Sequence, residues 1–149
     1  MLIISFIFGW FLNSLFLTLD VHKEKPFFGS EERSSPYDRV KDRHLQLFSD
    51  RLVISFPYIQ LASYADTNSM DPLIDEHANG LEIIPESEEE VHVGDIIAYQ
   101  SGDDLISHRV TFIGEDGLGW YAIAKGDNSD KPEKVRFGQI KYILIGILY

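Results

Sequence analysis

The chain has 149 residues, which suits a single domain, and 44% of them are hydrophobic, enough for one core. Its formal net charge is −11 at pH 7, and residues 52–108 contain no Lys or Arg, so the balance argues against nucleic-acid binding, which needs a clustered basic surface. The absence of cysteine excludes disulfides, thiolate catalysis and cysteine metal sites.

The amino terminus carries a long apolar segment. Residues 2–19 are uncharged and rich in Phe, Leu and Ile. A helix of this length spans ~27 Å, close to the ~30 Å hydrocarbon core of a bilayer. No basic side chain precedes the segment, and Thr18-Leu19-Asp20 is a poor cleavage site, which favours a retained anchor over a cleaved secretory signal. We expect residues 1–19 to form one transmembrane helix in the lipid bilayer.

The next part of the chain predicts a linker and then a hairpin. Residues 20–43 mix Pro, Gly and Ser with charges and show no apolar period, so we expect a juxtamembrane linker. Apolar residues then alternate on both sides of Ser49-Asp50, which favours a β-hairpin over a short helix at residues 40–47. The folded domain is expected to cover residues 44–149.

From Ile59 onward the pattern is that of short strands and turns. Turn signals such as Ser101-Gly102-Asp103 separate apolar runs at intervals of about ten residues, which predicts a mainly β domain, an antiparallel barrel or folded sheet. The expected strands are Leu81–Ile84, Asp95–Gln100, His108–Ile113, Trp120–Ala124 and Ile140–Leu148.

Three short strings offer the groups of a serine acyl-transfer site. They are Ser69-Met70-Asp71-Pro72, Ser107-His108-Arg109-Val110 and Lys125-Gly126-Asp127-Asn128. A serine hydroxyl attacks a carbonyl only when a neighbouring base removes its proton. Histidine titrates near neutrality and can take that proton, and a carboxylate can fix its tautomer and stabilise the imidazolium.

Together with Gly94-Asp95-Ile96-Ile97, these strings resemble type I signal peptidases of the archaeal and endoplasmic-reticulum branch. Four motifs occur in the family's order, over roughly residues 52–149. The resemblance implies a serine peptidase domain in which Ser69 is the nucleophile and His108 stands where the bacterial branch has a lysine base. It also implies that Asp127 orients the histidine.

Two aspartates are candidates for the carboxylate of the predicted site. The family has a second asparagine where this chain has Ser129, and it commonly has a further aspartate a few residues on. Asp130 is the nearest candidate for that aspartate, so the choice between Asp127 and Asp130 stays open at this point. Gly126-Asp127-Asn128-Ser129 is also a good turn sequence, which alone would explain its composition.

Residues around the serine suggest supporting roles. Thr67 is a candidate for an oxyanion hole with the backbone N–H of Ser69. Met70 offers an adaptable apolar wall for substrate, and Pro72 restricts the chain just beyond the nucleophile, so both are substrate-binding candidates.

His108 begins an apolar strand, where side chains alternate between faces. Val110 and Phe112 are expected on its face, so an ordinary half-buried histidine is the competing interpretation. Arg109 should point to the other face and pair with a carboxylate. Asp95 is expected to cap a turn or the entry to a strand.

The sequence therefore predicts a membrane-anchored, signal-peptidase-like serine endopeptidase. Its substrates would be precursor polypeptides with signal peptides, and other membrane subunits are candidate partners. We expect no metal and no cofactor, because the chemistry needs none and the histidines lack ligand spacing. The basic residues after the apolar run favour the cytoplasmic side, whereas the resemblance implies an extracytoplasmic catalytic domain. We expect the extracytoplasmic side, because the charge near the apolar run is mixed and its bias is small.

Two alternatives remain. A self-cleaving repressor-type peptidase, by resemblance, would have a lysine base and an amino-terminal DNA-binding domain, where this chain has its apolar segment. A non-catalytic, membrane-tethered β-domain that binds extended peptides would need none of the acyl-transfer chemistry.

Overall fold

The computed structural model describes residues 32–149 of the chain. The expected anchor at residues 1–19 lies outside the described residues, as does the first half of the expected linker. Within the part described, no helix is long and apolar enough to cross a bilayer. Arg33–Tyr149 forms one compact unit.

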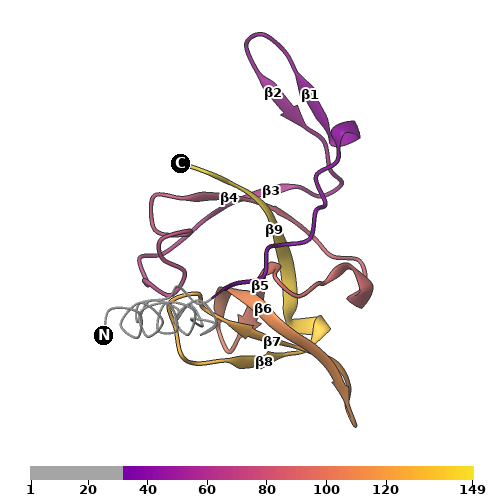
Figure 1. The fold of residues 1–149 in the computed structure, drawn as a ribbon, viewed down its shortest axis with the longest axis vertical. Helices are drawn as coiled ribbons and strands as arrows, with labels where there is room; N and C mark the ends of the chain where they lie inside the picture. The colour runs from indigo at the N-terminus through magenta and orange to yellow at the C-terminus, as the bar shows by residue number, and fades with distance from the viewer. Residues whose placement is uncertain (1–31) are drawn as a thin grey trace, which may run out of the picture. The chain divides into compact units, whose positions relative to one another are not determined.

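The unit is mainly β and antiparallel, as the sequence predicts (Figure 1). Its larger sheet has seven strands in the order β3-β4-β9-β5-β6-β7-β8. Their bounds are Gln60–Ser63 for β3, Asn79–Ile83 for β4, Ile96–Ser101 for β5, Asp104–Asp116 for β6, Gly119–Lys125 for β7, Glu133–Val135 for β8 and Ile140–Leu148 for β9. The five strands predicted from the sequence are confirmed, and β3 and β8 are additional.

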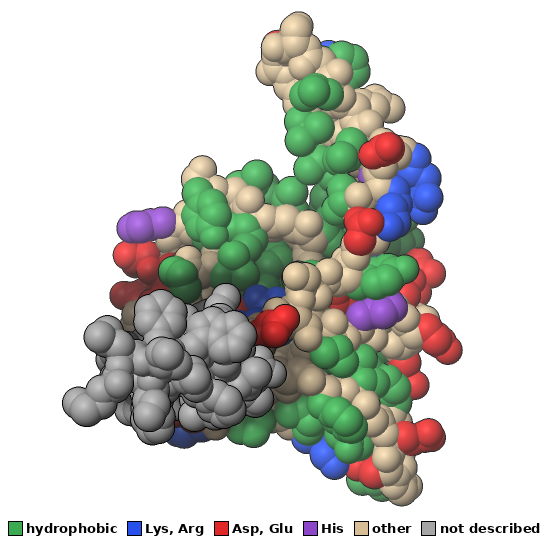
Figure 2. Space-filling model, viewed as in Figure 1, with side chains coloured by type: hydrophobic (Ala, Val, Ile, Leu, Met, Phe, Trp, Pro, Cys, Tyr) green, Lys and Arg blue, Asp and Glu red, His purple; other side chains and the backbone are tan. Residues whose placement is uncertain are grey.

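The predicted hairpin is confirmed and forms a second, two-stranded sheet. β1 (Leu45–Leu47) pairs with β2 (Leu52–Ile54), after a short 3-10 turn, η1 (Asp42–His44). The hairpin projects away from the larger sheet (Figure 1), and hydrophobic side chains are exposed along it (Figure 2). The side chain of Leu47 is the most exposed of them.

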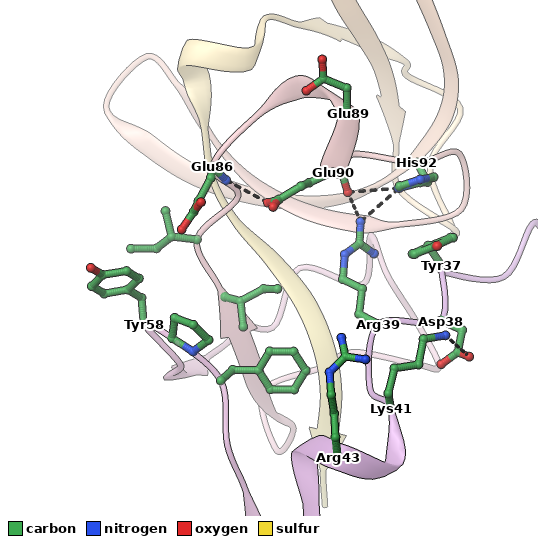
Figure 3. A pocket seen from close by; sticks show the side chains of 14 residues that line it. Tyr37, Asp38, Arg39, Lys41, Arg43, Tyr58, Glu86, Glu89, Glu90 and His92 are labelled. Atoms are coloured by element: carbon green, nitrogen blue, oxygen red, sulfur yellow. Dashed lines mark hydrogen bonds and ion pairs between the residues drawn. The ribbon is translucent and has the colours of Figure 1, made fainter.

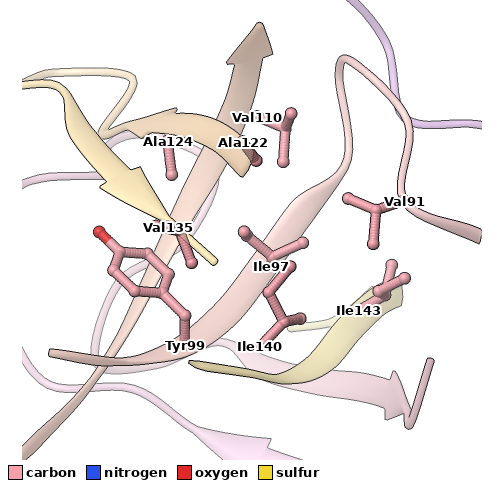
Figure 4. Packing of buried hydrophobic residues seen from close by; sticks show 9 residues of the cluster. All are labelled: Val91, Ile97, Tyr99, Val110, Ala122, Ala124, Val135, Ile140 and Ile143. Atoms are coloured by element: carbon pink, nitrogen blue, oxygen red, sulfur yellow. The ribbon is translucent and has the colours of Figure 1, made fainter. Parts of the chain in front are cut away.

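The core lies on one face of the larger sheet (Figure 4). Tyr99, Ile97 and Ile143 are among its largest fully buried side chains. Because side chains alternate along a strand, Ile96 points to the other face and packs in a second cluster with Met70 and other apolar residues. This second cluster fixes the segment after Ser69 against the sheet.

One detail of β6 differs from the expected alternation. The register with β7 shifts between Val110 and Phe112, which marks a β-bulge. His108 and Val110 are both buried, but Phe112 is 52% exposed. The prediction that Phe112 shares the histidine's face is therefore wrong, because the extra residue of the bulge breaks the two-residue period.

The segment at residues 33–43, expected as a linker, is attached to the domain through Asp95. The Asp95 side chain is fully buried. It accepts hydrogen bonds from the backbone N–H of Tyr37 at 3.0 Å and of His92 at 2.7 Å. The guanidinium of Arg39 donates two hydrogen bonds to the same carboxylate, at 2.6 and 2.7 Å. Asp95 thus caps the turn before β5, as predicted, and also binds the segment that enters the domain.

We expect Asp95→Ala to destabilise the domain by ~3–5 kcal/mol, because it leaves the Arg39 guanidinium, 10% exposed, without its buried partner. Urea denaturation of the full chain measures this change. Asp50→Ala is the matched control, since Asp50 pairs with Arg51 at 3.6 Å with both side chains exposed, and such pairs contribute ~1 kcal/mol or less. Equal midpoints for the two variants would contradict the assignment.

Candidate functional site

Ser69 and His108 line the same groove, which has a volume of ≈ 770 Å³. β3 and the loop after it form one side, and the first half of β6 forms the other. Thr67 and Met70 also line the groove, whereas Pro72 is exposed and is not among the lining residues. The remaining lining residues are Gln60, Ala62, Ser63, Tyr64, Ala65, Ile74, Glu82, Ala98, Asp104, Leu105, Ile106 and Ser107.

The position of Ser69 depends on the loop after β7. The backbone N–H of Asn128 donates to the carbonyl oxygen of Ser69 at 2.9 Å, and its side-chain amide donates to that of Asn68 at 3.0 Å. The N–H of Asp127 lies 3.4 Å from the sulfur of Met70. Asn68 has a φ of 57°, a left-handed conformation that asparagine tolerates better than most residues. Hydrogen bonds therefore join the string that contains Ser69 to the string that contains Asp127.

Gly126 marks the point where the serine segment and the histidine approach each other. A β-carbon at this position would lie 2.6 Å from the carbonyl oxygen of Ser69 and 3.1 Å from Nε2 of His108. Only a residue without a side chain lets both groups come this close to its backbone. The glycine of the Lys-Gly-Asp-Asn string is thus required by the packing of the site.

His108 has a defined hydrogen-bond partner on the side away from Gly126. Its Nδ1 lies 3.1 Å from the hydroxyl of Tyr99, and that hydroxyl donates to Oε2 of Glu133 at 2.9 Å. A carboxylate only accepts hydrogen bonds, so the tyrosine hydrogen points to Glu133 and its oxygen accepts from the histidine. The network assigns the hydrogen to Nδ1 and leaves Nε2 with a free lone pair. This is the tautomer that a general base requires.

The surroundings of His108 keep it neutral to lower pH than an exposed histidine. Burial lowers its pKa below the ordinary value, and the charges of Glu133 and then Asp127 partly oppose this effect. Burial and the contact with Glu133 raise the pKa of Tyr99, so its hydroxyl stays protonated. The tyrosine therefore remains a neutral hydrogen-bond partner of both His108 and Glu133.

Asp127 binds Arg109 and makes no hydrogen bond to His108 among the residues the structure describes. Arg109 donates from Nε to Oδ1 at 2.8 Å and from Nη2 to Oδ2 at 2.7 Å, with both side chains under 10% exposed. Arg33 adds a second cation at 3.4 Å. The expected pairing of Arg109 with a carboxylate is confirmed, and that carboxylate is the one expected to orient the histidine. Asp127 acts on His108 through its charge.

The carboxylate connected to the histidine is Glu133, which the sequence motifs do not single out. Asp130, the nearest candidate for the family's further acid, is exposed and has no hydrogen bond within the described part of the chain. The sequence could have indicated Glu133 only as an acidic residue downstream of Asp127, where the family has a further acid. The tyrosine between Glu133 and His108 has no signature in the sequence.

The hydroxyl groups of Thr67 and Ser69 lie 3.1 Å apart. Across residues 32–149 no hydrogen bond joins the Ser69 hydroxyl to His108. Thr67 is therefore next to the predicted nucleophile, and its role in an oxyanion hole stays a prediction.

Among the described residues, no lysine or arginine lines the groove. Lys125, the basic residue of the third string, donates to the carbonyl oxygen of Ser129 at 2.9 Å and so stabilises the turn. In the described range there is also no group of three His, Cys, Asp or Glu side chains that could hold a metal. The described groove therefore offers the His108 imidazole, and no amine, as a candidate base.

A second hollow, of ≈ 490 Å³, lies around Arg39 and the 3-10 turn η2 (Glu88–Glu90) (Figure 3). Arg39 donates to the backbone oxygen of Glu90 and lies 3.3 Å from Nδ1 of His92. None of the residues lining this hollow is a serine, threonine or cysteine. Its charged groups hold the segment at residues 33–43 and offer no nucleophile.

Searches against protein-family models, curated proteins and solved structures found no match to this chain.

We expect Gly126→Ala to displace Ser69 from the histidine and to cost ~1–3 kcal/mol of stability, because the new methyl group overlaps a backbone oxygen. Thermal unfolding of the full chain measures this cost. Gly138→Ala is the control, since a β-carbon there meets nothing within 4 Å. If both variants unfold at the wild-type temperature, the close approach at Gly126 is not present.

Proposed function

We propose that this chain is a membrane-anchored serine endopeptidase of the signal-peptidase type, which cleaves precursor polypeptides that carry signal peptides. The observation that supports this most strongly is the placement of His108 beside the serine segment. Ser69 and His108 line one groove, and Nε2 of His108 faces Gly126 next to the Ser69 backbone, while Nδ1 is bonded to the Tyr99 hydroxyl. The resemblance of the sequence motifs supplies the substrate class.

In the proposed reaction, Ser69 turns from Thr67 toward His108, and Nε2 takes the hydroxyl proton as the oxygen attacks the scissile carbonyl. Negative charge builds on the carbonyl oxygen, where the Thr67 hydroxyl and the Ser69 N–H are the candidate donors. His108 then gives the proton to the leaving amine, which leaves an acyl-enzyme. Water, deprotonated by the same nitrogen, attacks the ester and regenerates the serine.

Glu133 and Tyr99 have a clear task in this scheme. When His108 takes the proton, it becomes an imidazolium in a buried position, which is unfavourable without a nearby negative charge. The Tyr99 hydroxyl accepts from Nδ1–H, and Glu133 holds that hydroxyl from the other side. The pair thus keeps the ring oriented and stabilises its charged form.

Two strand edges border the groove and suit an extended substrate. Residues 104–108 of β6 pair with β5, and the ladder with β7 begins only at Arg109. In the described sheet no strand occupies the second edge of residues 104–108. β3 is the outermost strand on the other side. A peptide can add to such an edge through main-chain hydrogen bonds.

A peptide-binding domain without catalysis is the second candidate. The contact that favours it is the hydrogen bond of Ser69 to Thr67 in place of His108. Labelling by a serine-directed covalent probe separates the two, because only an activated serine reacts with it.

We expect Ser69→Ala and His108→Ala each to lower cleavage of a precursor in membranes by about 10³-fold or more, because each removes a group that the chemical step requires. His77→Ala is the matched control, since the side chain of His77 is 90% exposed. Rates of precursor cleavage, with the covalent probe as a second measurement, provide the test. Wild-type rates in either active-site variant would refute the proposal.

Cleavage should decrease in acid as His108 becomes protonated, with a midpoint below the ordinary histidine range, because burial lowers its pKa. Glu133 opposes that shift, so Glu133→Gln should lower the pKa of His108 further and move the acid limb to lower pH. It should also reduce the plateau rate by about tenfold or more, because the charged ring loses its partner.

Profiles of cleavage rate against pH for wild type, Glu133→Gln and Asp130→Asn test this assignment. Asp130 is exposed, and its variant should keep the wild-type profile. A shift of the acid limb to higher pH in Glu133→Gln would contradict the role assigned to Glu133.

A further inference from the structure

A buried glutamate, Glu82, also lines the groove of Ser69 and His108. It lies on β4 and is only 2% exposed. Glutamate is almost never fully buried unless it is paired, because removing its charge from water costs several kcal/mol. The proposed reaction does not use this residue, so its burial needs another reason.

The partners of Glu82 are neutral. Gln60, its cross-strand neighbour on β3, donates from Nε2 to Oε2 at 3.0 Å, and the hydroxyl of Tyr64 donates to Oε1 at 3.2 Å. Within residues 32–149 no lysine, arginine or histidine forms an ion pair with it. A carboxylate offers about four acceptor positions, and these two donors fill half of them.

The position of Tyr64 is built around this contact. A β-carbon at Gly80 would overlap the Tyr64 hydroxyl, so the glycine makes room for the ring. Burial, followed by the charge and the hydrogen bond of Glu82, raises the pKa of Tyr64. The tyrosine therefore remains a donor and does not become an anion beside the glutamate.

The rest of the groove favours a cation. Of the residues that the structure describes, Asp104 is the other acid that lines it, and no lysine or arginine does. Apolar side chains, among them Met70, Ile74 and Ala98, line the groove as well and are buried. Electrostatic attraction is stronger in such surroundings than in water.

We propose that Glu82 determines specificity in this groove by binding a lysine or arginine side chain of the extended substrate. The inference rests on the proposed function for the identity of the groove. Gln60 belongs to an edge strand and is half-buried, so its amide can turn aside while an ammonium or guanidinium takes its place on Oε2. A substrate with an apolar side chain of equal length supplies no positive charge to pair with the Glu82 carboxylate.

The test uses pairs of peptides that differ only by Lys or Met at one position, scanned through each position around the cleaved bond. We expect one position at which the wild-type full chain prefers Lys by at least tenfold in kcat/KM. Glu82→Gln, which keeps the shape and removes the charge, should reduce that preference to less than twofold. Asp104→Asn is the control, since Asp104 is exposed in the same groove, and it should keep most of the preference.

Binding of the same peptides to wild type and Glu82→Gln, measured by fluorescence anisotropy, separates this inference from the proposed function. A Lys preference in binding that Glu82→Gln abolishes, with no cleavage, supports the inference and refutes the peptidase. Cleavage without any Lys preference overturns the inference alone. Should Glu82→Gln fail to fold, Gln60→Ala replaces it: the loss of a competing donor should strengthen the Lys preference, and an unchanged or weaker preference would overturn the inference.

Discussion

The ion pair between Arg109 and Asp127 is the interaction that holds the site together. It joins β6, next to His108, to the loop that carries Gly126 and binds the backbone of Ser69. Both side chains are nearly buried, and Arg109 also donates to the backbone oxygens of Gly94 and Ser34. β6, the loop that carries Gly126 and the segment of Ser69 are therefore held together, although they are far apart in the sequence. Asp127 is needed for this assembly, which explains why it is not free to bond the histidine.

With Asp127 committed to Arg109, the histidine takes its carboxylate from another strand. The Tyr99 hydroxyl, from β5, contacts both His108 on β6 and Glu133 on β8, so these hydrogen bonds link three strands of the sheet. These hydrogen bonds also affect the chemistry of the histidine, because they favour the tautomer that carries its hydrogen on Nδ1. Nε2, on the opposite side of the ring, is then the nitrogen that the proposed reaction uses as its base, and burial lowers the pKa of the ring.

Local patterns in the sequence were enough to predict much of the fold. Alternating apolar residues and turn residues predicted the hairpin at Leu45–Ile54 and five strands of the larger sheet, and Asp95 was identified as a cap. β8 has three residues, too few for any period to be read, and the bulge before Phe112 depends on pairing with β7. Arg109 was expected to bind a carboxylate, but which one it binds is decided by tertiary packing. The same holds for Glu133, whose link to His108 passes through a tyrosine from a third strand.

The proposed chemistry requires that His108 carries its hydrogen on Nδ1 and presents a bare Nε2 to the groove. Nitrogen-15 NMR of the histidine ring in the full chain measures this directly, because protonated and bare ring nitrogens have well-separated shifts. At neutral pH we expect a neutral ring with hydrogen on Nδ1, and a mixture of tautomers when Tyr99 is replaced by Phe. A ring that carries its hydrogen on Nε2, or one unaffected by Tyr99→Phe, would contradict this assignment.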